Sequence, residues 1–140
     1  MAVVFSSNTD FKLPFKQSLI KNLIKTIAAH YGKTIGSIAY VFCDDEYLLD
    51  VNRKFLNHDF YTDIITFDYT ENQTINGDII ISVERVKDNA QKFQVPFEEE
   101  LKRVIIHGIL HLCGLKDKSV KQSVAMRKAE EEALQLFHDL

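Results

Sequence analysis

The spacing of apolar residues changes repeatedly along this chain, and this change restricts its fold more than any other feature. Between Pro14 and Tyr31, apolar side chains recur every three or four residues, which is typical of an amphipathic helix. Ile38–Cys43 and Ile64–Phe67 are short runs of β-branched and aromatic residues, which favour strands. Helical segments that alternate with strand-like runs predict an α+β or α/β domain with about four strands.

The boundaries of the expected elements follow from proline, glycine and capping residues. We expect strands at 2–5, 38–43, 64–67 and 78–81, and helices at about 14–31, 45–55, 83–93, 96–113 and from about 119 onward. Asn76-Gly77 predicts a turn that joins two strands into an antiparallel hairpin. Ser119 and Gln122 have the spacing of a capping box at the last helix. Residues 1–140 are therefore expected to form one small α+β domain, with an approximately four-stranded mixed sheet and about five helices.

Composition favours a soluble globular protein in a reducing compartment. The 140 residues are 46% hydrophobic and 26% charged. The longest unbroken apolar run is the six residues of Ile38–Cys43, so no transmembrane helix is expected. The apolar start of the chain is also too short for a secretory signal. Two cysteines do not make a disulfide framework, so we expect a cytoplasmic location and no membrane association.

Charge is distributed unevenly, although the net charge is only −3. Residues 101–128 carry seven basic side chains and one acidic side chain, Asp117, which gives this stretch a local charge of +6. Acidic residues gather instead at 44–46, 98–100 and 130–132. A basic stretch can attract phosphate groups, although an ordinary solvated surface would have the same composition. The basic residues are Lys102, Arg103, Lys116, Lys118, Lys121, Arg127 and Lys128.

Two histidines on one predicted helix make the strongest candidate site. Four residues advance a helix by about 400°, so His107 and His111 leave the same face one turn apart. Gly114 can end the helix in a left-handed conformation, and the turn can then bring Asp117 back as a third ligand. Two imidazoles and a carboxylate suit zinc, with nickel, cobalt or manganese as alternatives. Three protein ligands leave a fourth position for water, as in catalytic sites; the alternative is a pair of histidines bonded to backbone carbonyls.

Other residues near the two histidines restrict which ligands and which reactions the site could have. Cys113 lies about 200° around the helix from His111 and is expected in the core. The position after His107, where a metalloprotease usually has a glutamate, is Gly108, which has no side chain to accept a proton. Peptide hydrolysis by the usual route is therefore disfavoured, and the basic stretch is more consistent with a phosphodiester substrate. We expect His30, His58 and His138 to lie outside the site.

The segment His107–Gly114, which reads H-G-x-L-H-L-x-G, resembles the signature of the YbeY family, bacterial endoribonucleases of rRNA maturation. Leu49–Phe55, together with Asp59 and Thr62–Phe67, is similar to the family block L-N-x-x-F-R-x-x-D-x-P-T-D-V-L-S-F. Gly77–Ser82 is similar to the family's G-D-I strand, and Met126–Glu131 to its closing helix. The resemblance covers most of residues 48–134.

This resemblance implies a small α+β fold with a zincin-like metal helix and one zinc ion per chain. It also implies metal-dependent cleavage of single-stranded RNA, with a role in small-subunit rRNA maturation and ribosome assembly in the bacterial cytoplasm. The expected partners are rRNA and the ribosome or its proteins, and no DNA substrate is expected. Zinc-bound water or the 2′-hydroxyl of the RNA would attack phosphorus, and no protein side chain is assigned as the base.

The main departures from the family pattern lie at three places in the chain. The chain has Leu115-Lys116-Asp117 where the family commonly has Tyr-Asp-His, so the third ligand becomes a carboxylate and the site has one positive charge less. Leu56 replaces an arginine that would be expected to hold phosphate, and Tyr61 replaces a proline. Arg53, Lys54 and Lys116 are the candidates for binding RNA in place of that arginine.

Two other functions remain open from the sequence. One is a non-catalytic ribosome-associated factor whose metal joins the helix to the turn, and Leu56 is the residue that favours it. The other is a metal-dependent hydrolase of peptides or small molecules, against which Gly108 counts.

Overall fold

The structure is a computed structural model that describes residues 2–139, and over this range it has the expected mixed architecture of five helices and one four-stranded sheet. The chain order confirms the predicted alternation of strands and helices, and with it the α+β fold class. The elements are β1 (Ala2–Ser7), α1 (Gln17–His30), β2 (Thr34–Cys43), α2 (Asp45–Leu56), β3 (Ile64–Asp68), β4 (Thr74–Ser82), α3 (Val83–Phe93), α4 (Phe97–Leu112) and α5 (Val120–Asp139).

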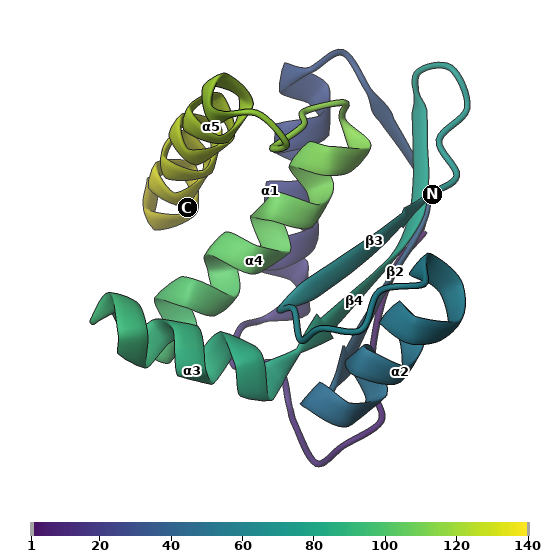
Figure 1. The fold of residues 1–140 in the computed structure, drawn as a ribbon. Coiled ribbons are helices and arrows are strands. Elements are labelled where there is room, and N and C mark those ends of the chain that lie inside the picture. Colours follow the sequence, from purple (N-terminus) through teal and green to yellow (C-terminus); the bar gives the residue numbers. More distant parts are fainter. Residues whose placement is uncertain (1, 140) are drawn as a thin grey trace.

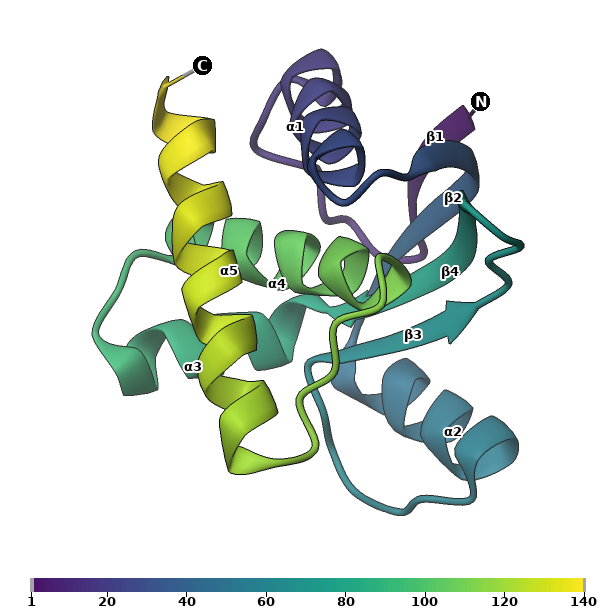
Figure 2. The ribbon, with the colours of Figure 1, turned by 90° about the horizontal axis from the view of Figure 1, so that it is seen from above.

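The sheet has the strand order β1-β2-β4-β3, which places β3 at one edge (Figure 1). β1 and β4 both run parallel to β2, whereas β3 pairs antiparallel with β4. Helices α1 and α4 cover one face of the sheet, α5 packs outside α4, and α2 lies against the opposite face (Figures 1 and 2). The edge strand β3 therefore lies between α4 and α2.

Apolar side chains form two clusters, one on each face of the sheet. The larger cluster contains the buried stripes of α1 and α4, together with β2 and β4 residues such as Ile38 and Ile79. The smaller cluster joins α2 to the other face through residues that include Leu48, Val51 and Ile65. Helix α4 is the most buried helix because it lies between the sheet and α5, so side chains on it are held firmly. Among residues 2–139, no helix combines the length and the apolar character needed to cross a membrane.

The first helix begins later than the proline pattern predicted. We expected α1 to start at about Pro14, but it starts at Gln17. The residues before it are not helical, and two of their aromatic rings pack onto other elements. Phe11 contacts Phe42 and Phe97, and Phe15 lies edge-on to Phe137 at 5.6 Å between ring centres.

The predicted antiparallel hairpin of β3 and β4 is confirmed, but the turn expected at Asn76-Gly77 was wrong. Both residues lie inside β4, and the connection from β3 turns at residues 71–74 instead. Asn76 uses its side-chain oxygen to accept a hydrogen bond from the backbone N–H of Ser37 in β2. Gly77 is required for close packing, since a Cβ there would lie 2.8 Å from Leu112 of α4 and 2.7 Å from the backbone oxygen of Phe67. A pattern typical of turns was therefore caused by tight helix–sheet contact.

Two contacts fix the distance between α4 and the sheet. A Cβ at Gly108 would lie 2.9 Å from Ile79 and 3.2 Å from Ile64, so only glycine permits this separation. The buried hydroxyl of Tyr40 in β2 donates a 2.9 Å hydrogen bond to the backbone oxygen of Ile105 in α4. Gly108 faces the sheet, so the position that carries a glutamate in metalloproteases is buried here and could not present a base to a cavity.

Candidate metal centre

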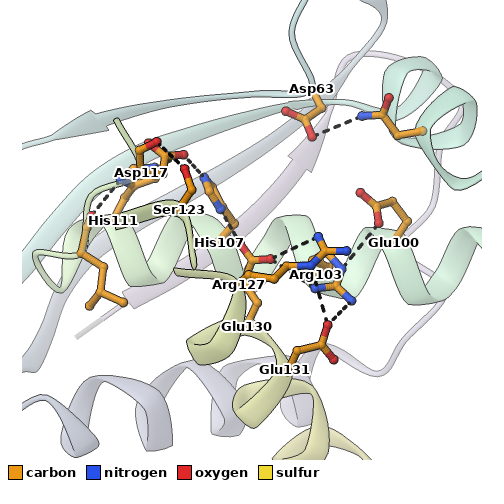
Figure 3. A network of polar contacts seen from close by, with 12 residues as sticks. Asp63, Glu100, Arg103, His107, His111, Asp117, Ser123, Arg127, Glu130 and Glu131 are labelled. Carbon is orange, nitrogen blue, oxygen red and sulfur yellow. Dashed lines mark hydrogen bonds and ion pairs between the residues drawn. The ribbon is translucent and has the colours of Figure 1, made fainter. Parts of the chain in front are cut away.

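Helix α4 presents His107 and His111 side by side, and the turn after it brings Asp117 to both rings (Figure 3). The centres of the two imidazole rings lie 4.6 Å apart. Oδ2 of Asp117 lies 3.3 Å from Nε2 of His107 and 3.5 Å from Nε2 of His111. The structure therefore brings together the three residues that the sequence singled out as candidate ligands.

The turn that carries Asp117 is built as the sequence predicted. Gly114 has a φ of +105°, which side-chain-bearing residues rarely adopt, and this reverses the chain after α4. The N–H of Leu115 then donates to the oxygen of Leu110 at 3.0 Å. The Ser123 hydroxyl donates to the backbone oxygen of Asp117 at 2.9 Å, which ties the turn to α5. The capping box also forms, with reciprocal 3.1 Å hydrogen bonds between Ser119 and Gln122.

The Nδ1 atom of each imidazole ring contacts an oxygen on the side away from Asp117, which directs both Nε2 atoms toward Asp117. Nδ1 of His107 lies 2.7 Å from Oε2 of Glu130 on α5. Nδ1 of His111 lies 3.0 Å from the backbone oxygen of Leu115. An imidazole that donates its Nδ1–H to a carboxylate or carbonyl keeps the Nε2 lone pair free for a metal ion, and metal-binding histidines commonly have such partners.

The two histidines titrate in opposite directions because their partners differ. Burial lowers the pKa of His107, but the hydrogen bond to Glu130 and the charges of Glu130, Asp117 and Asp63 outweigh it, so the net shift is upward. Burial and the neighbouring His107 lower the pKa of His111, and Asp117 offsets this only in part. The anionic surroundings of His107 thus favour positive charge at this site, whether from a proton or from a cation.

The donor atoms fit a single divalent ion. One ligand atom from each of His107, His111 and Asp117 lies within 4.8 Å of the other two, so the cluster could hold a metal ion. Two imidazole nitrogens and one carboxylate oxygen form a three-ligand set of the catalytic type, with room for a further ligand. The identity of the ion and the role of each residue as a ligand stay predictions.

A cavity of about 510 Å³ opens beside the histidines. One wall is formed by β3 and the residues just before it, and the other by α4 and the turn that follows. The lining residues are Thr62, Asp63, Ile64, Thr66, Asp68, His107, His111, Gly114, Leu115, Lys116 and Asp117.

Two acidic residues at the site were not singled out from the sequence. Glu130 is buried and bridges Nδ1 of His107 and the guanidinium of Arg103, which lies 3.2 Å from it. Asp63 lines the cavity, and burial raises the pKa of its carboxyl group. Both fall in segments that resemble the family pattern, but the sequence carries no spacing rule that links residue 130 to residue 107.

The basic stretch is less available for phosphate than its charge predicted. Arg103 contacts Glu100, Glu130 and Glu131, and Arg127 lies near Glu130 and Glu131. Acidic residues of α4 and α5 therefore pair with two of the seven basic residues of this stretch.

The three RNA-binding candidates occupy different environments. Arg53 pairs with Asp59, and Lys54 pairs with Asp50 at 3.0 Å. Neither residue lines the cavity beside the histidines, whereas Lys116 does.

The remaining histidines and the cysteines lie where the sequence indicated. Cys113 is buried with a free thiol, and burial raises its pKa to about 11, so it is a poor candidate ligand. His30 is at the end of α1, and His58 stacks on Phe60. His138 lies outside the site as expected, and its exposed side chain has Nε2 3.5 Å from Glu99.

Comparison with known proteins gives consistent matches over nearly the whole chain. The family model described as "Endoribonuclease YbeY" matches residues 5–138. A Flavobacterium psychrophilum protein named Endoribonuclease YbeY is 51% identical, with 97% of this chain and 96% of the relative covered. A Porphyromonas gingivalis protein of the same name is 53% identical over 89% of this chain and 82% of the relative. A solution structure from Thermotoga maritima superposes with a TM-score of 0.64 at 26% identity, covering 99% of this chain and 93% of that one.

Proposed function

Because this chain belongs to the YbeY endoribonuclease family, we propose that it is a metal-dependent endoribonuclease that cleaves single-stranded RNA during small-subunit rRNA maturation. In this proposal residues 1–140 act as one hydrolase domain with one zinc ion. RNA is the substrate, the ribosome or its proteins are the partners, and DNA is not a substrate. The two free, buried cysteines and the bacterial relatives are consistent with action in the bacterial cytoplasm.

The observation that carries this proposal is the shared orientation of three donor atoms. His107 and His111 direct Nε2 toward Oδ2 of Asp117, and a separate hydrogen-bond partner fixes each ring. An ion held by these atoms would supply Lewis-acid polarisation of a phosphodiester. A histidine pair with a purely structural role would have no need of an anionic oxygen between its two free nitrogens.

The residues around the donor atoms have separable roles in such a site. Lys116 lines the cavity and would hold a phosphate oxygen, as one of the three candidates considered in place of the family arginine. Glu130 would keep the His107 ring in one orientation. Gly108 supplies no proton acceptor, because it faces Ile79 in the core. The peptidase alternative therefore loses its usual base.

A non-catalytic ribosome-associated factor is the second candidate, and Leu56 favours it. Leu56 stands in place of an arginine, and the nearby Arg53 and Lys54 are paired with their own acids. With less positive charge for phosphate, the metal would then serve to hold the turn against α4. This candidate predicts RNA or ribosomal-protein binding without turnover.

Cleavage assays with purified protein distinguish the two candidates. We expect cleavage of single-stranded rRNA fragments that stops on chelation and returns when zinc is restored, with manganese, cobalt and nickel compared in parallel. His111→Ala should lose activity, whereas the control His30→Ala, at an exposed helix end, should keep it. Activity that survives both chelation and His111→Ala would point to a contaminating nuclease. RNA binding without turnover in metal-loaded protein would favour the non-catalytic role.

A further inference from the structure

We propose that three exposed aromatic residues beside the cavity, Phe55, Phe60 and Tyr61, form a surface on which bases of single-stranded RNA stack. We call them the aromatic strip. This inference rests on the proposed endoribonuclease function and deepens it by naming where the substrate lies beyond the metal centre. Base stacking on aromatic side chains is a common way for proteins to hold single strands without reading their sequence.

The strip is unusually exposed for aromatic side chains. The exposed fractions are 69% for Phe55, 54% for Phe60 and 48% for Tyr61. Single exposed apolar residues are ordinary on protein surfaces, but three rings within seven residues of chain are a concentration that indicates binding.

Contacts with the rest of the chain hold the strip in place. The amide of Asn52 donates a 2.9 Å hydrogen bond to the backbone oxygen of Phe60, and the ring of Phe60 stacks on His58 at 5.1 Å. The hydroxyl of Tyr61 donates to Glu46 at 2.7 Å. Phe55 lies edge-on to Phe67 of β3 at 5.9 Å. Ordering these rings before binding reduces the entropy cost of stacking a base on them.

The strip is continuous with the cavity along the chain and across the sheet edge. Residues 55–61 lead directly into Thr62, Asp63 and Ile64, which line the cavity. The backbone oxygen of Asp63 accepts a hydrogen bond from the N–H of Ser82 in β4, and the N–H of Tyr69 donates one to the backbone oxygen of Asn76. In an antiparallel ladder the residues that face the partner strand alternate, so the backbone groups of Thr66 and Asp68 face the free edge of β3. A strand leaving the cavity would cross this edge to reach Phe55, which contacts Phe67.

The charged groups around the strip offer few free cations for phosphates. Residues 44–63 contain six acids and two basic residues, Arg53 and Lys54, which already pair with Asp59 and Asp50. Arg85 lies over one face of the Tyr61 ring at 5.1 Å and pairs with Asp45, so the other face of Tyr61 is the one offered to a base. Such a surface repels a phosphate backbone, so the affinity of the strip for RNA has to come from stacking on the ring faces, which any base can provide. Phosphates would be held instead near the metal centre and Lys116.

Binding of a labelled RNA of about ten nucleotides, followed by fluorescence anisotropy, tests the strip. We expect Phe60→Leu and Phe55→Leu to weaken binding at least about fivefold each, since leucine is apolar but has no ring face. Phe60→Trp should restore wild-type affinity. Leu19→Ala, an exposed apolar residue of α1, is the control and should bind as wild type. Circular dichroism melts identify any variant that fails to fold, and a gel confirms that the RNA stays intact.

A strand with abasic sites separates stacking from other effects. Wild-type protein should bind the abasic strand more weakly than the normal strand, and the Phe60→Leu variant should bind both alike. If the folded leucine variants retain wild-type affinity for RNA, the strip does not stack bases; this is also the outcome expected if the strip docks a protein partner. If wild-type protein neither binds nor cleaves RNA, the proposed function itself fails. If wild-type protein cleaves RNA and the leucine variants bind RNA with wild-type affinity, the stacking role of the strip is wrong and the proposed function stands.

Discussion

Glu130 offers the sharpest test of how the candidate metal centre is held. Its buried carboxylate lies 2.7 Å from Nδ1 of His107 and 3.2 Å from Arg103. Glu130→Gln keeps the size of the side chain and an oxygen that can still accept from His107, but it removes the charge. Arg103 keeps Glu131 at 2.9 Å, so its own charge is not left without a partner. The substitution therefore acts mainly on the histidine.

Glu130→Gln should cause two measurable losses, one in the stability of the protein and one in its affinity for zinc. Replacing a charged acceptor by a neutral one should lower the free energy of unfolding of the metal-free protein by about 1–2 kcal/mol. Loss of the carboxylate that orients His107 should weaken zinc binding by about 10- to 100-fold, which is about 1.4–2.7 kcal/mol. The first is read from urea unfolding, and the second from competition with a zinc-binding dye.

Glu131→Gln is the matched control. It lies on the same helix, contacts the same arginine and changes the net charge equally, but it has no contact with either candidate histidine ligand in the described structure. We expect this control to bind zinc as wild type does. Equal zinc affinity in Glu130→Gln and wild type would refute the reasoning that Glu130 holds His107 in its binding orientation.

Other substitutions and conditions test the remaining parts of the site. Asp117→Asn should weaken zinc binding at least about tenfold, whereas Asp117→His should retain it, as measured with the same dye; unchanged binding in Asp117→Asn would remove this residue from the ligand set. Gly108→Ala places a Cβ 2.9 Å from Ile79. The resulting strain should cost about 1–3 kcal/mol, whereas the higher helix propensity of alanine should contribute about 1 kcal/mol. Urea unfolding should therefore show equal or lower stability, and a gain in stability would contradict this account. Burial lowers the pKa of His107, but Glu130 raises it by more, so the net shift is upward. The metal-free protein should therefore lose stability as pH rises from about 6.5 through the raised pKa. Glu130→Gln should flatten that dependence, and a wild-type profile that is already flat would contradict the assignment.

The sequence predicted the approach of the three candidate ligands better than the contacts that surround them, because local geometry decides the first and tertiary contacts decide the second. The approach of His107, His111 and Asp117 follows from helical spacing and one glycine turn, which are short-range properties. Glu130 comes from a different helix, and its position depends on how α5 packs against α4. No local pattern carries that information.

The errors in the fold and in the charge pattern have the same origin. Gly77 lies in a strand because α4 approaches it closely, whereas a local pattern with asparagine before it favours a turn. Arg103 on α4 pairs with Glu130 and Glu131 on α5, which no local pattern indicates, whereas Arg127 has the same two acids three and four residues along its own helix. Contacts between elements therefore decide the environments of Gly77 and Arg103.

The two contacts that hold α4 on the sheet are separate from the three candidate ligands. Tyr40 bonds the backbone of Ile105 and Gly108 rests on Ile79, and neither contact involves an imidazole ring. Asp117, in contrast, sits on a turn that is anchored by its own backbone and by Ser123. A substitution at 117 can therefore change the donor atom that lies beside the two imidazoles, while the contacts that hold α4 on the sheet stay in place.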